Sequence, residues 1–151
     1  MFGATFTLIL FTEEHMKAKG SYSVKKWDES TYEEISPNTK LTKASVEYAV
    51  TGEIEGKATE ECLMFYKNFN AADPHSSTAS YVGLIRFVVN IGGRSGSFVM
   101  TDEGTFASGA ANSRLQIQDG SGTDALKGIR GSGTYRADKD GVKFELEYEV
   151  G

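Results

Sequence analysis

The 151-residue chain contains one cysteine, two prolines and two histidines, and each scarcity excludes a class of structure or site. Because Cys62 is alone, no internal disulfide can form, and a reducing, cytoplasmic location is expected. The Cys62 thiol has no basic neighbour on its own face of a strand and is interpreted as a buried packing group. A histidine zinc site or a Ser-His-Asp triad needs histidines on a rigid scaffold, so His15 and His75 are interpreted as surface loop residues. No metal and no cofactor are expected.

Positive charge is also scarce. Lys and Arg number 16 against 21 Asp and Glu, which gives a net charge of −5 and argues against nucleic acid as a partner. No apolar run is long enough to cross a bilayer, so a membrane is not expected as a partner either. The composition favours a small or neutral partner.

The first eleven residues, MFGATFTLILF, are apolar but lack the positive start and small-residue cleavage site of a secretory signal. Two interpretations of the extension 1–15 remain open. Thr5–Phe11 forms an added strand that covers an edge or a partner subunit, or translation begins at Met16 and the extension is accidental. The first interpretation predicts a homodimer or higher homo-oligomer, whose size gel filtration of a chain beginning at Met16 would test.

Glycine is abundant, and twelve of the 17 glycines fall between Gly83 and Gly141. The runs Tyr81–Ile91 and Ser97–Phe106 are rich in β-branched and aromatic residues, and the short cluster Gly92–Gly96 separates them. This pattern predicts a β-hairpin. The glycine cluster joins strand to strand rather than strand to helix, so it is interpreted as a turn and not as a phosphate-binding loop.

Similar runs predict the remaining strands. Period-two alternation or short apolar runs indicate strands over Lys17–Lys25, Lys40–Ile54, Lys57–Phe69, Ala110–Gln118, Ser132–Ala137 and Val142–Val150. Asp28–Asn38 and Asn68–Ser77 are predicted to be polar loops. One helical turn is expected over Ala125–Lys127, with Thr123 or Asp124 as its cap and Gly128 as its exit.

About eight strands with hairpin-sized connections predict an all-β fold. The simplest arrangement is a single closed antiparallel β-barrel over residues 16–151, because closure removes the unpaired edges of the sheet. An eight-stranded barrel has an interior that side chains just fill, or one that holds a single small ligand.

Several groups of residues resemble those of a known family. They are Tyr81–Leu84, Arg86-Phe87, Gly92–Val99, Gly104–Phe106, Gly120–Thr123, Leu126, Gly128, Arg130-Gly131 and Gly133, together with Lys19–Ser21, Trp27-Asp28 and Gly52–Gly56. The chain from Met16 onward resembles the uncharacterised bacterial domain of unknown function 3224. The resemblance implies a β-barrel with an axial cavity, similar to the allene oxide cyclase barrel, and no established reaction. The chain departs from the family pattern at Ile85, where an acidic residue is expected, and at Asp102, where histidine is frequent.

Alternation also predicts which side chains face the barrel interior. With Phe98 inward, Met100 and Asp102 share its face, and burial among apolar side chains would raise the pKa of such a carboxyl group. Glu60 and Glu61 lie on opposite faces of their strand, so one of them faces inward. The predicted ligand-binding residues are Tyr48, Glu61, Tyr66, Phe87, Phe98, Met100 and Asp102; Tyr22 or Trp27 is expected at a rim.

Three functions remain open. The first is binding of a small, largely apolar molecule in the barrel interior, since pockets of this kind combine aromatic walls with a few polar groups. The second is an isomerase or cyclase that uses an inward carboxylate, Asp102 or Glu61, in a dry cavity. The third is a filled barrel with a structural or oligomeric role, so enzymatic activity stays undecided. A cavity below about 300 Å³ would argue against the first two.

Overall fold

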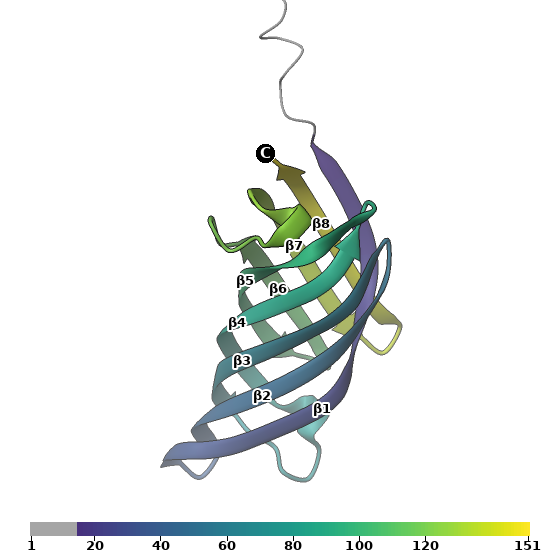
Figure 1. Cartoon of the computed structure of the whole chain (residues 1–151). Helices are drawn as coiled ribbons and strands as arrows, with labels where there is room; N and C mark the ends of the chain where they lie inside the picture. Colours follow the sequence, from purple (N-terminus) through teal and green to yellow (C-terminus); the bar gives the residue numbers. More distant parts are fainter. Residues whose placement is uncertain (1–14) are drawn as a thin grey trace, which may run out of the picture.

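The computed structural model describes residues 15–151, so the predicted strand over Thr5–Phe11 lies outside the described part of the chain. The elements are β1 (Met16–Ser36), β2 (Thr39–Gly52), β3 (Ile54–Asn68), η1 (Pro74–Ser76), β4 (Thr78–Ile91), β5 (Arg94–Ala107), β6 (Ala110–Ile117), η2 (Asp124–Leu126), β7 (Ile129–Asp138) and β8 (Gly141–Val150). Every strand pairs antiparallel with its neighbour in sequence, and β1 pairs with β8, so the eight strands form a closed barrel (Figure 1). The predicted fold is confirmed.

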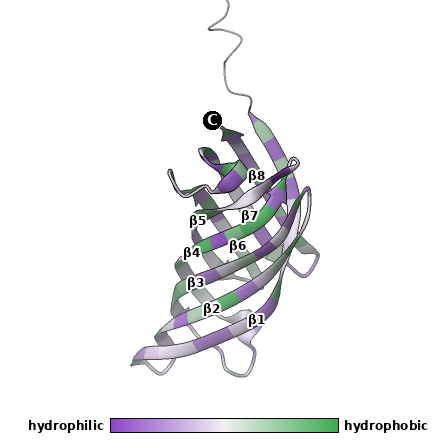
Figure 2. Cartoon of the chain, in the orientation of Figure 1, coloured by the Kyte–Doolittle hydropathy of each residue, from purple (hydrophilic) through white to green (hydrophobic). Residues whose placement is uncertain are grey.

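The alternating pattern of each strand decides which residues fill the barrel. Ile85, Phe87, Val89 and Ile91 of β4 are 5% exposed or less, whereas the intervening side chains are exposed. In Figure 2, hydrophobic and hydrophilic residues accordingly follow one another along the strands. The inward face predicted for β5 is confirmed as well, since Phe98, Met100 and Asp102 are 5% exposed or less.

The predicted loop over Asp28–Asn38 is wrong for most of its length, because β1 continues as a strand to Ser36. Three irregularities in its pairing with β2, between Val24 and Lys26, Thr31 and Glu33, and Glu34 and Ser36, break the period of two. Bulges of this kind add an unpaired residue and so conceal the alternation on which a strand prediction depends. The segment from Ser23 to Ser36 is exposed, which explains its polar composition.

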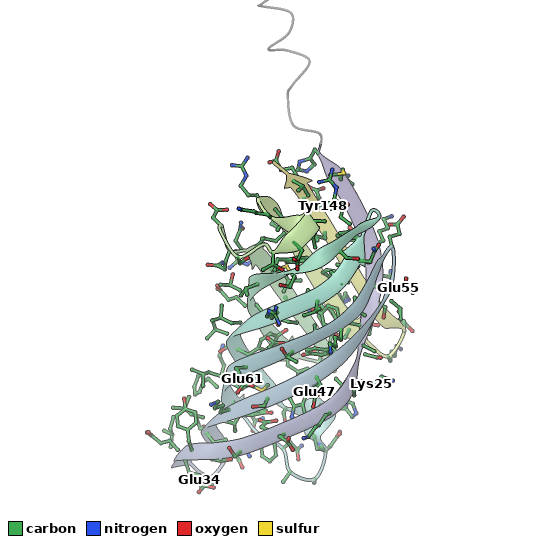
Figure 3. All side chains as sticks on the ribbon, in the orientation of Figure 1. Lys25, Glu34, Glu47, Glu55, Glu61 and Tyr148 are labelled. Carbon is green, nitrogen blue, oxygen red and sulfur yellow. The ribbon has the colours of Figure 1, made fainter. Side chains whose placement is uncertain are left out.

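The two ends of the barrel are built differently. At the end that holds Met16 and the C-terminus, η2 closes the interior with Leu126, which is fully buried. The predicted helical turn is confirmed here, although the Thr123 side chain does not cap it; Thr123 Oγ1 instead lies 2.7 Å from Ser97 Oγ on β5. At the opposite end lie η1 and the far part of β1, whose tip carries Glu34 (Figure 3).

Ring packing fills the η2 end. Phe87 and Phe98 stack with their centroids 5.6 Å apart, and Phe144 lies 5.6 Å from Phe87. Tyr22 contacts the rings of Phe87 and Phe144 and is 2% exposed. It therefore belongs to the interior rather than to a rim. This half of the barrel is filled with side chains.

The seam that closes the barrel is short. β1 pairs with β8 only from Met16 to Gly20, opposite Tyr148 to Phe144, whereas β1 pairs with β2 as far as Ser36. Beyond Gly20, the edge of β1 at the seam therefore has no paired strand. Val24 and Trp27 lie on the inner face of this part of β1 and are 50% and 45% exposed, so the η1 half of the interior opens to solvent along β1.

Candidate functional site

A cavity of about 290 Å³ occupies the η1 half of the barrel. This volume lies just below the roughly 300 Å³ at which the usual range of ligand pockets begins, and so just below the limit set from the sequence. It excludes a drug-sized ligand, and only a smaller molecule fits. Aromatic side chains form much of its wall. The lining residues are Tyr22, Val24, Trp27, Val46, Tyr48, Glu60, Cys62, Met64, Tyr66, Phe69, Pro74, His75, Tyr81, Asp102, Phe106, Ala111, Ser113 and Tyr135.

Two carboxyl groups face this cavity from different strands. Glu60 on β3 is 4% exposed and Asp102 on β5 is 5% exposed. Glu60 Oε2 and Asp102 Oδ1 meet no hydrogen-bond donor among the described residues, and the two carboxyl groups lie within hydrogen-bonding reach of each other. An ionised carboxylate only accepts hydrogen bonds, so this contact is satisfied when one group carries a proton. We call Glu60 and Asp102 the carboxyl pair.

Gly83 makes the carboxyl pair possible. It lies on β4 between the two strands and is directly opposite both Cys62 and Asp102. A Cβ atom at Gly83 would lie 2.6 Å from the Glu61 carbonyl oxygen and 2.9 Å from Glu60 Oε2. Because glycine has no side chain, the two carboxyl groups can approach each other across β4.

Electrostatics place a proton on this pair. Burial, the hydrogen bond with Asp102 and the charge of Asp102 raise the pKa of Glu60 to about 10, while the hydrogen bond from Tyr48 opposes the shift. The Tyr48 hydroxyl donates to Glu60 Oε1 at 2.9 Å. At neutral pH the pair therefore holds a proton, which the two carboxyl groups share.

Phenol groups surround the carboxyl pair. The Tyr22 ring stacks on Tyr135 with a centroid distance of 4.3 Å, and it meets the Tyr48 ring edge-on at 4.9 Å. Burial raises the pKa of Tyr22 and Tyr48, and it raises that of Tyr135 to about 12. These phenols are therefore neutral at physiological pH. Tyr22 and Tyr135 come from β1 and β7, so their stack spans the seam.

Two further hydroxyl contacts define the cavity walls. The Tyr81 hydroxyl lies 2.6 Å from Ser113 Oγ and is thereby held against β6. Nearer the mouth, the Tyr66 hydroxyl donates to Glu29 Oε2 at 2.9 Å, and Thr42 Oγ1 donates to the same oxygen at 2.6 Å. The Glu29 carboxylate thus connects the exposed part of β1 to β2 and β3.

The structure places the seven predicted ligand-binding residues in three environments: the cavity wall, the filled half of the barrel and, for Glu61, the outer face. Tyr48, Tyr66 and Asp102 line the cavity. Phe87, Phe98 and Met100 are fully buried in the filled half of the barrel and do not line it. Their ligand-binding role stays a prediction, without support from the lining of this cavity.

Glu61 lies on the outer face of the barrel, so Glu60 is the inward carboxyl group of β3. Glu61 accepts a hydrogen bond from Ser45 at 2.8 Å and lies 3.7 Å from Lys43 Nζ, with 60% of its side chain exposed. This placement corrects the expectation of an inward Glu61. The signal was present in the sequence: Glu60 shares its face with Ala58, Cys62 and Met64, whose apolar side chains favour the interior.

Cys62 and the two histidines behave largely as expected. Cys62 is buried, and burial raises the pKa of its thiol, so it is not an activated nucleophile. His15 is exposed and lies 3.1 Å from Glu147 Oε2, and His75 belongs to η1 at the cavity mouth. Within residues 15–151, no group of three His, Cys, Asp or Glu side chains is placed to hold a metal ion. No helix in that range is long and apolar enough to cross a membrane.

A larger hollow of about 980 Å³ lies beside the barrel wall and is lined mainly by exposed side chains, among them Leu63, Val82, Glu103 and Arg114. Glu103 and Arg114 form an exposed ion pair there at 3.1 Å. The hollow contains neither member of the carboxyl pair. The interior cavity is therefore the better candidate for a functional site, despite its smaller volume.

Residues 18–148 match the model of a family described as "Protein of unknown function (DUF3224)". The chain belongs to the DUF3224 family. A crystal structure of a DUF3224 protein of unknown function from Shewanella oneidensis MR-1, at 1.84 Å resolution, is similar with a TM-score of 0.70. The two sequences are 23% identical over 89% of this chain and 97% of the other, a likeness that shows the fold.

None of the curated proteins compared with this DUF3224 chain matches it. The predicted family membership is confirmed, whereas the likeness to the allene oxide cyclase barrel stays a prediction. Ile85, where the resemblance implied an acidic residue, lies directly opposite Glu60 in the β3–β4 pairing. In this chain, the inward carboxyl group beside Asp102 thus comes from β3.

Proposed function

We propose that this DUF3224 protein binds a small, largely apolar molecule in the η1 half of its barrel. The observation that carries the proposal is the aromatic cavity of about 290 Å³ with two buried carboxyl groups in its wall. A dry apolar cavity of about 150 Å³ holds benzene, so this volume suits a molecule of one or two rings. Its polar end would reach the carboxyl pair, and its apolar body would contact the Tyr22, Tyr48 and Tyr135 rings.

Trp27 provides a direct test of binding, because it is the only tryptophan of the chain and lines the cavity. Titration with 2-phenylethanol is expected to change its fluorescence in a saturable manner. Native mass spectrometry of the purified protein should also detect a bound small molecule.

A substitution that fills the cavity separates binding from nonspecific effects. Val46 is 3% exposed and lines the cavity, so Val46→Phe should abolish the fluorescence change. Leu63→Phe adds a ring to the outer face of β3, where Leu63 is 48% exposed, and should leave binding intact. Equal binding by wild type and Val46→Phe would contradict the proposal.

A catalytic role is the second candidate, and the protonated Glu60 beside Asp102 favours it. Such a pair can donate and accept a proton within a cavity lined mainly by aromatic side chains, as an isomerase or cyclase requires. Incubation with phenylacetone in D₂O tests for this chemistry, because general acid–base catalysis exchanges the protons next to the carbonyl group. Exchange that is detected by NMR and lost in Glu60→Gln would support catalysis, whereas binding without exchange would support the first function.

A further inference from the structure

We propose that the ligand of the interior cavity is a small organic cation, a primary amine on a body of one or two rings, whose ammonium group binds between Glu60 and Asp102. This inference rests on the proposed binding function and assigns its ligand class. It follows from the hydrogen-bonding character of the cavity, its charge and its aromatic wall.

The most buried part of the cavity offers hydrogen-bond acceptors to a ligand. Apart from the proton that the carboxyl pair shares, Glu60 Oε2 and Asp102 Oδ1 have no donor among residues 15–151, although both side chains are at least nine-tenths buried. The other oxygen of Glu60 already accepts from Tyr48. A primary ammonium group has three donors and can satisfy both unpartnered oxygens at once.

The charge of the cavity has the sign that a cation requires. Its lining contains two carboxyl groups and no Lys or Arg; His75, at the mouth, is the one basic side chain among these residues. A buried carboxylate needs a compensating partner. Without a ligand, the proton shared by the two carboxyl groups offsets part of their negative charge. A bound ammonium ion would replace this proton with a full positive charge.

Aromatic faces supply the remainder of a cation site. The stacked Tyr22 and Tyr135 rings and the Tyr48 ring lie in the wall that also carries the carboxyl pair. Aromatic faces attract ammonium groups within about 6 Å of the ring centre. The cavity rim already shows this contact, since Lys40 Nζ lies 3.6 Å from the centroid of Phe69, a lining residue.

Three probes of nearly equal size test the inference: phenethylamine, 2-phenylethanol and phenylacetate. Isothermal titration calorimetry at pH 7.5 should show phenethylamine binding at least tenfold more tightly than 2-phenylethanol, and phenylacetate binding more weakly than either. Burial of a second anion beside the carboxyl pair explains the last expectation.

Proton linkage gives a second readout that a merely apolar contact would not produce. Phenethylamine displaces the shared proton, so up to one proton should be released per ligand bound. Calorimetry in two buffers of different ionisation enthalpy measures this release. The affinity for phenethylamine should also rise between pH 6 and pH 8, where the amine stays protonated.

Two matched pairs of variants connect the preference to the carboxyl pair. Glu60→Gln and Asp102→Asn should reduce the affinity for phenethylamine to that for 2-phenylethanol. Glu61→Gln and Glu103→Gln alter the adjacent outward carboxyl groups and should preserve the preference. The other titratable groups that face the pair are the phenols of Tyr22, Tyr48, Tyr81 and Tyr135 and the Cys62 thiol, with His75 at the mouth; His75→Gln should leave the pH dependence unchanged.

The outcomes distinguish this inference from the proposed function. If 2-phenylethanol binds as tightly as phenethylamine and Val46→Phe abolishes both, the cavity binds ligands but the cation assignment is overturned. Proton uptake on amine binding, or an amine preference that survives both Glu60→Gln and Asp102→Asn, would overturn it as well. If none of the three probes binds, the binding function and the cation assignment both fall.

Discussion

Burial and charge conflict at Glu60, whose side chain is 4% exposed in the folded barrel. The conflict is resolved by a proton on Glu60, by the contact with Asp102 and by the hydrogen bond from Tyr48. The contact with Asp102 depends on Gly83, which leaves space between β3 and β5. One missing side chain on β4 thus determines the chemistry of two carboxyl groups on its neighbours.

The stability of the protein should fall as the pH rises from 6 to 9. The pKa of Glu60 rises from 4.5 to about 10 on folding, so between these values the folded state binds one proton more than the unfolded state. The associated stability is fully present below about pH 4.5 and is lost as the pH rises toward 10, by up to about 1.4 kcal/mol per pH unit. Urea denaturation at several pH values measures this slope.

Glu60→Gln should flatten that slope, because the amide cannot titrate but still donates to Asp102 and accepts from Tyr48. Glu61→Gln, which changes the neighbouring exposed carboxyl group, should retain it. A wild-type stability that is constant from pH 6 to pH 9 would show that the proton is not held as described.

Gly83→Ala should destabilise the fold by about 1 to 3 kcal/mol, the usual cost of overpacking. The added methyl group would lie 2.6 Å from a backbone oxygen and would force Glu60 away from Asp102, so the pH dependence should weaken as well. Leu84→Ala on the same strand is a suitable control, because Leu84 is 56% exposed and should change stability by about 0.5 kcal/mol or less. Thermal and urea denaturation compare the two variants, and equal stability would argue against the crowded geometry at Gly83.

At the scale of elements, β1 and η2 have opposite roles. β1 changes from a barrel strand into an exposed ribbon beyond Gly20, and three irregularities in its pairing accompany the change. Its exposed part opens the cavity. The short η2 turn closes the other end, where Leu126 belongs to the same buried cluster as Phe98 and Ile117.

Leu126→Ala should cost about 2 to 5 kcal/mol of unfolding free energy, because it leaves a cavity in the filled half of the barrel. Lys127→Ala, at the adjacent exposed position, should have little effect. Since Leu126 does not line the ligand cavity, Trp27 fluorescence in the native state should be unchanged. Urea denaturation supplies the comparison, and a loss below about 0.5 kcal/mol would mean that η2 is not a structural plug.

At the scale of the whole molecule, the barrel is closed by its shortest strand pairing. The β1–β8 seam has five residue pairs, whereas β3 and β4 pair along nearly their whole lengths. Exposed ion pairs flank the seam, including Lys17 with Glu147 and Lys19 with Glu145, and such pairs contribute little stability. We therefore expect the seam to be the weakest part of the barrel wall.

Native-state hydrogen exchange should reveal this weakness. The backbone amides of Met16–Gly20 and Phe144–Tyr148 that bond across the seam should exchange faster than those in the centre of the β3–β4 pairing, because local opening there breaks fewer contacts. Equal protection of the two regions would show that the barrel opens only by global unfolding.

The sequence by itself determined the all-β class, the closed barrel and the inward set of most strands. The reason is local: in a strand, successive side chains point to opposite faces, so alternation records burial directly. It also placed Asp102 inside, and it offered Glu60 as one of two candidates. Where bulges interrupt the alternation, as in Asp28–Ser36, the same rule failed.

Only the tertiary structure decided which inward residues meet one another. Glu60 meets Asp102 across an intervening strand, and Tyr22 stacks on Tyr135 across the seam, although long stretches of sequence separate the partners. Strand register and the curvature of the closed sheet set these contacts, and neither is encoded in a local pattern. For the same reason, only the structure showed that Phe87 and Phe98 fill one half of the barrel while the cavity occupies the other.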